Sequence, residues 1–132
     1  MPAVIDAAVP YLAYLLSALM MLAVFLVLYT RVTRFDELKL IREGNAAAAL
    51  SLGGAILGFS CTLAFSIALH ASWHLFLVWS AAAMIVQVVA YACVARALRH
   101  MNQAIHDGNA AMGGVMGAIS AGVGVINAAC LT

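Results

Sequence analysis

Long apolar stretches broken at only a few points dominate the chain. Residues 7–30, 44–95 and 108–132 contain no Asp, Glu, Lys or Arg. A helix needs roughly 20 apolar residues to cross a hydrocarbon layer about 30 Å thick. The first and last stretches therefore predict one membrane span each. The middle stretch holds 52 residues, and as one helix it would extend about 78 Å at 1.5 Å per residue, so it must fold back on itself.

The most polar point of the middle stretch is the segment 71–74, whose Trp73 suits the headgroup level of a bilayer. Long apolar blocks argue against strands, because a membrane barrel shows alternating polarity. The predicted fold is an all-α integral membrane protein with one domain over residues 1–132. Its four spans are predicted at about 8–29, 45–69, 75–95 and 109–131.

The composition points to lipid as the solvent. Hydrophobic residues make up 67% of the chain and charged residues 8%, whereas soluble domains carry about 25% charged residues. The formal net charge of +1 leaves no basic face for nucleic acid. A free soluble enzyme, a disordered segment and a nucleic-acid binder are therefore excluded, and the lipid bilayer is the predicted partner.

The basic residues predict the orientation. All six lie in the segments 31–44 and 96–108, which we expect to be cytoplasmic loops: Arg31, Arg34, Lys39, Arg42, Arg96 and Arg99. Both termini are then predicted on the outer, periplasmic side. No basic residue precedes the first apolar run, so this run is expected to be an uncleaved anchor.

Two segments of the chain match at a spacing of 64 residues. Residues 41–47 and 105–111 share Ile, an acid, Gly, Asn, Ala and Ala in the same order. The match predicts a tandem two-helix repeat, with repeat one at about 8–69 and repeat two at about 75–131. Each unit has two spans, so the copies are expected to share one orientation about an axis along the membrane normal.

These motifs resemble a known family. The acid-Gly-Asn-Ala-Ala starts at Glu43 and Asp107, the Gly-rich continuation at 53–58 and the closing Asn-Ala-Ala-Cys at 127–130 look like the bacterial inner-membrane family called domain of unknown function 350. The resemblance covers nearly the whole chain. It implies a four-span, two-repeat protein of the inner (plasma) membrane with no established biochemical activity. The setting that it implies is envelope stress and membrane maintenance.

Small residues form stripes on the second and fourth predicted spans. In the fourth span, small residues from 110 to 128 are spaced alternately by four and three, which places them on one helix face. Close backbone approach through such residues drives helix packing in lipid. Gly53 and Gly122 lie partly off the stripes, which predicts contact between subunits of a homo-oligomer. The predicted packing residues are Gly53, Gly54, Gly58, Gly113, Gly114, Gly117, Gly122 and Gly124.

Asn45 and Asn109 each follow a glycine at the start of a predicted span. We expect them to be N-caps, whose side-chain oxygen accepts a backbone hydrogen bond. The preceding acids, Glu43 and Asp107, would lie favourably at the positive helix ends. In the alternative, the two helix starts form a shared cytoplasmic vestibule that binds an anion, or a cation through Glu43 and Asp107.

The other polar residues within the spans favour a role in helix packing over a role in transport. No predicted span has a charged residue near its centre, which argues against an ion-coupled transporter. Gln87 and Asn127 predict interhelical hydrogen bonds, with a polar ring in an oligomeric pore as the alternative.

The histidines and cysteines do not predict a cofactor. His70 and His74 flank the outer turn, so they do not share a helix face. The cysteines 61, 93 and 130 form no Cys-x-x-Cys motif and are expected to be small apolar packing residues. No metal, haem or disulfide is therefore predicted.

The function expected from the sequence is a non-enzymatic, oligomeric inner-membrane protein, an accessory in envelope stress or membrane maintenance that acts with a membrane or cytoplasmic protein partner. The alternative is an oligomeric channel or a conduit for ions or small solutes, which requires a polar path through the membrane. A membrane-enzyme subunit or a haem-binding partner is the third option.

Overall fold

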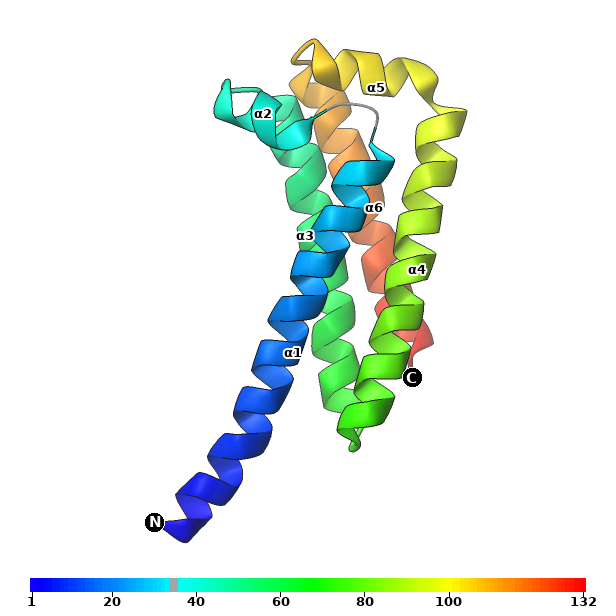
Figure 1. The fold of residues 1–132 in the computed structure, drawn as a ribbon. Coiled ribbons are helices and arrows are strands. Elements are labelled where there is room, and N and C mark those ends of the chain that lie inside the picture. The colour runs from blue at the N-terminus through cyan, green and yellow to red at the C-terminus, as the bar shows by residue number, and fades with distance from the viewer. Residues whose placement is uncertain (34–35) are drawn as a thin grey trace.

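The computed structural model describes residues 1–33 and 36–132, which form six helices (Figure 1). The helices are α1 (Pro2–Val32), α2 (Glu37–Arg42), α3 (Ala46–Leu69), α4 (Trp73–Ala97), α5 (Arg99–His106) and α6 (Ala110–Cys130). Within these described ranges there is no strand. Four helices, α1, α3, α4 and α6, are long and apolar enough to cross a membrane. The prediction of an all-α protein with four spans is confirmed. Arg34, one of the basic residues used to predict the orientation, lies outside the described residues.

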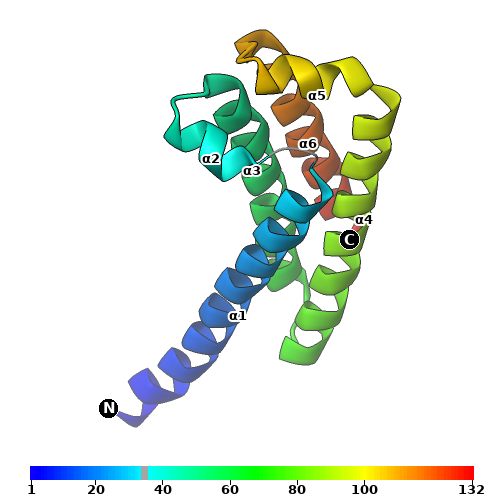
Figure 2. The same cartoon turned by 45° about the horizontal axis from the view of Figure 1, so that its top comes forward.

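The long helices alternate in direction, so both termini lie at one end of the bundle and α2 and α5 at the other (Figures 1 and 2). Helix α1 has 31 residues and is about 46 Å long at 1.5 Å per residue. Its N-terminal part projects beyond the turn between α3 and α4 (Figure 1). The helix therefore begins earlier than the predicted span.

The turn between α3 and α4 is shorter than predicted, because Trp73 already belongs to α4. The indole Nε1 of Trp73 donates a hydrogen bond to Oγ of Ser17 on α1 (2.9 Å). The hydroxyl of Tyr14 donates to the carbonyl of Ala71 (3.4 Å). Both contacts hold the turn against α1.

The segments predicted as plain loops each contain a short helix, which corrects that expectation. The side chain of Asp36 caps α2 by accepting from the backbone N–H of Lys39 (3.1 Å). Helix α5 buries Met101 and Ile105 against the bundle. These short helices form because each has an apolar side that the ends of the long helices can cover.

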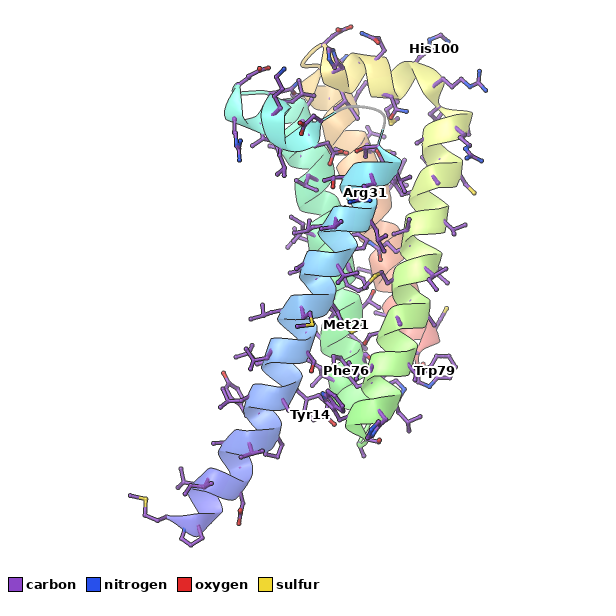
Figure 3. All side chains as sticks on the ribbon, in the orientation of Figure 1. Tyr14, Met21, Arg31, Phe76, Trp79 and His100 are labelled. Carbon is purple, nitrogen blue, oxygen red and sulfur yellow. The ribbon has the colours of Figure 1, made fainter. Side chains whose placement is uncertain are left out.

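Two kinds of packing hold the bundle together. Rings of α1 pack on those of its neighbours: Phe25 stacks on Phe59 of α3 with centroids 4.5 Å apart. Tyr14 lies against Phe76 of α4 at 5.4 Å (Figure 3). Helices α3 and α6, in contrast, approach through small residues. The aromatic contacts therefore hold α1 against the bundle, and the small residues let α3 and α6 pack closely together.

Candidate functional site

Five of the predicted packing glycines lie in the contact between α3 and α6 within one subunit. A Cβ atom on Gly54 would overlap the backbone of Gly117, and one on Gly124 would overlap the backbone of Gly58. A Cβ on Gly113 would overlap the backbone at the start of α3. The two backbones therefore touch along most of their length, as small residues in lipid allow.

The other three predicted packing glycines face outward. No atom lies within 4 Å of a Cβ built on Gly53 or Gly122, and Gly114 would meet only the tip of Leu50 at 4.0 Å. An open groove of about 340 Å³ runs over α3 and α6 at this level. Its lining consists of Ala49, Leu50, Gly53, Gly54, Leu57, Gly114, Gly117, Ala118 and Ala121.

The two Gly-Asn turns have matching geometry. Gly44 and Gly108 have φ values of +87° and +88°, a conformation that favours glycine. Asn45 and Asn109 each accept a hydrogen bond from the backbone N–H three residues further on, at 3.1 Å and 3.3 Å. Each Asn therefore caps the long helix that follows, α3 or α6.

Asn45 has a second role that joins the two turns. Its Nδ2 donates to the carbonyl of Ile105 (2.9 Å) and of His106 (3.2 Å) at the end of α5. In the described part of the chain, the side chain of Asn109 makes the cap bond alone. Asn45 therefore ties the start of α3 to α5.

We expect Asn45→Ala to lower the free energy of unfolding by about 2–4 kcal/mol, against about 1 kcal/mol for Asn109→Ala. Loss of an N-cap accounts for about 1 kcal/mol in each variant. The two bonds to α5 add about 0.5–1.5 kcal/mol each at Asn45. Denaturant unfolding of both variants in one mild detergent measures the difference. Equal losses of unfolding free energy in the two variants would show that the hydrogen bonds from Asn45 to α5 contribute nothing to stability.

The acids before these turns lie on the surface. Glu43 is exposed, and Asp107 accepts from Nε2 of Gln103 (3.0 Å) and lies 3.7 Å from Nδ1 of His106. Over residues 1–33 and 36–132, no three His, Cys, Asp or Glu side chains cluster in a way that could hold a metal. Ion binding at Glu43, Asn45, Asp107 and Asn109 stays a prediction.

Gln87 and Asn127 bond between helices. Nε2 of Gln87 donates to the carbonyls of Ala55 (3.5 Å) and Ser120 (3.3 Å), and Nδ2 of Asn127 donates to that of Ala83 (2.9 Å). The three cysteines, in contrast, are exposed and free on the outer surface. Their exposure corrects the expectation that they are small apolar packing residues.

Glu37 is a buried acid at the end of the bundle. It is the first residue of α2 and its exposed fraction is 0%. Neither carboxyl oxygen has a hydrogen-bond partner among the described residues. Burial raises the pKa of Glu37 to about 8.

Two tyrosines lie next to Glu37. Tyr29 of α1 and Tyr91 of α4 are both close enough to its carboxylate to interact electrostatically. Their ring centroids are 4.4 Å apart. The hydroxyl of Tyr29 shares a hydrogen bond with Oγ of Ser51 on α3 (3.3 Å). Glu37 therefore lies at the mouth of a polar region enclosed by three long helices.

Buried polar side chains continue from this point towards the other end of the bundle. A narrow pocket of about 10 Å³ lies beneath the tyrosines and reaches Gln87. Near the far end, Oγ of Ser80 donates to Oγ of Ser66 (2.9 Å), which lies 3.4 Å from Nδ1 of His70. We call the buried residues of this set the interior polar row: Tyr29, Ser51, Thr62, Ser66, Ser80, Gln87, Tyr91 and Ser120.

Comparison with known proteins identifies the family. The family model described as Domain of Unknown Function (DUF350) matches residues 3–131. The chain belongs to the DUF350 family. It is 29% identical over 129 residues, 98% of each chain, to the UPF0719 inner membrane protein YjfL of Escherichia coli (strain K12). It is also 29% identical over 119 residues, 89% of each chain, to the UPF0719 transmembrane protein YshE of Bacillus subtilis (strain 168). No solved structure matches it.

The resemblance to this family is thus confirmed, and the DUF350 chain is a multi-pass membrane protein. Sequence reasoning missed its buried acid, because Glu37 was counted among the charges of a solvated loop. A signal was present: Leu40 and Ile41 follow Glu37 by three and four residues. In a helix these positions share one face with it. Glu37 lies on α2, outside the four spans, so this buried acid adds to the prediction that no span has a charged residue near its centre and does not contradict it.

Proposed function

We propose that this DUF350 protein is a non-enzymatic component of the bacterial inner membrane that associates with copies of itself. Its two hairpins are copies of one unit, its α2 end faces the cytoplasm and both termini face the periplasm. The basic residues support this orientation, because Arg31 lies at the α2 and α5 end with the others described (Figure 3). As its role we propose membrane maintenance during envelope stress, together with a membrane or cytoplasmic partner.

The outward-facing groove over α3 and α6 is the observation that supports self-association. Five glycines pack between α3 and α6 within the subunit, yet Gly53 and Gly114 line an outward-facing surface of small residues. Such a surface lets a second helix approach closely, and helix association in lipid depends on that approach. A second copy of the chain is the occupant that we propose.

We expect Gly53→Leu to convert an oligomer into a monomer without unfolding the subunit. A Cβ at this position meets no atom within 4 Å, and the rest of the side chain would extend into the groove. The mass of the protein in mild detergent and in nanodiscs, measured by light scattering, checks this. Ala82→Leu, on an exposed position of α4 that does not line the groove, is the matched control. A monomeric wild-type protein, or an unchanged Gly53→Leu oligomer, would refute the proposal.

The interior polar row favours a second candidate, a conduit for ions or small solutes. The row includes Gln87, whose Oε1 has no hydrogen-bond partner among the described residues. Flux through proteoliposomes, measured under voltage and under tension, distinguishes this function. A conduit predicts a flux that Gln87→Leu reduces, and the absence of flux under both conditions would exclude it.

A further inference from the structure

Glu37 combines burial with an absence of partners. Its carboxyl group is fully covered and neither oxygen is hydrogen-bonded within the described ranges. The His106–Asp107 contact, 3.7 Å between Nδ1 and a carboxyl oxygen, does not involve it. A buried ionised carboxylate without compensation is strongly unfavourable, whereas the neutral acid avoids most of that cost.

Among residues 1–33 and 36–132, the groups that interact electrostatically with Glu37 are tyrosines, which supply no positive charge. From α1 and α4 they are Tyr29 and Tyr91, and α3 contributes Ser51 through its hydrogen bond to Tyr29. On α2 itself, Lys39 points to the exposed side. No described donor lies within hydrogen-bond distance of the carboxyl oxygens to stabilise an ionised carboxylate. The surroundings therefore suit the neutral acid.

A purely structural role does not require an acid here. Glutamine would fill the same volume without titrating, and an apolar side chain would bury at less cost. A buried ionisable group with a shifted pKa is a candidate functional site, because its burial is otherwise unfavourable. The hydroxyl of Tyr91 is likewise unpartnered in the described structure. It borders the small pocket below, whose volume of about 10 Å³ is close to that needed for one water.

We propose that Glu37 is a proton-binding site at the α2 end of the bundle, beside Tyr29 and Tyr91. On release, the carboxyl O–H bond breaks, the electron pair stays on the carboxylate and the proton passes to water at this end. On uptake, the reverse occurs. The raised pKa, caused by burial, places this exchange near neutral pH. The site does not depend on self-association.

The chain contains two glutamates, Glu37 and Glu43, so a label on glutamate carboxyl carbons reports two groups. The full protein in lipid nanodiscs, labelled with ¹³C at this carbon, is titrated from pH 4 to pH 10 by NMR. We expect one of the two resonances to titrate near pH 8. Glu37→Gln should remove this titration, and Glu43→Gln, a control at an exposed position, should leave it unchanged.

Two outcomes would overturn the proposal. In the first, neither glutamate resonance of the wild-type protein titrates near pH 8. In the second, Na⁺ or K⁺ added at pH 7 displaces the proton, which would make Glu37 a metal-cation site. A resonance of Glu37 that titrates near pH 8 and does not respond to either cation supports the proton site.

Discussion

Gly54→Ala is expected to destabilise the protein sharply, while Gly53→Ala, one residue away, leaves its stability unchanged or raises it. A Cβ on Gly54 would overlap the backbone of Gly117, so α3 and α6 would have to separate. Overpacking of this kind costs about 1–3 kcal/mol, and sometimes more. Gly53 has open space, and alanine inside a helix is favoured over glycine by about 0.5–1 kcal/mol.

Thermal unfolding followed by circular dichroism in one detergent measures both variants. The pair is well matched, since each adds one methyl group to the same helix at the same depth. Gly124→Ala, which would meet the backbone of Gly58, should behave like Gly54→Ala. If Gly53→Ala and Gly54→Ala had the same effect, α3 and α6 would not pack in the observed register.

The spans could be predicted from the sequence because their cause is local. A stretch free of charged residues and longer than the bilayer is thick forms a helix in lipid wherever its neighbours lie. The caps follow from similarly local chemistry, since Asn45 and Asn109 bond to N–H groups three residues away. The limits of the apolar stretches and the two Asn caps therefore indicated where α3 and α6 begin.

The role of each glycine could not be predicted, because it depends on the rotation of one helix against another. Gly53 and Gly54 lie about 100° apart around α3, and both belong to a small-residue surface. The register between α3 and α6 places Gly54 inside and Gly53 outside. The burial of Glu37 could not be predicted for the same reason. Helix α2 has only six residues, and its packing on the bundle decides which of its sides faces inward.

A consequence of the proton site is that the docking of α2 should weaken as the pH rises. In the undocked state Glu37 would have its ordinary pKa of 4.5, whereas the docked state raises this pKa to about 8. Above pH 4.5 the undocked form loses its proton and the docked form keeps it. Docking is therefore strongest below pH 4.5, weakens up to about pH 8, and is constant above that value.

Hydrogen exchange at the amides of Leu40 and Glu43, which bond to backbone carbonyls within α2, measures this docking. We expect their protection, corrected for the intrinsic exchange rate, to fall by up to about tenfold per pH unit between those two values. Glu37→Gln cannot ionise, so its protection should not vary with pH. A wild-type protection that is flat with pH, or a Glu37→Gln variant with the same slope, would show that α2 docks independently of this proton.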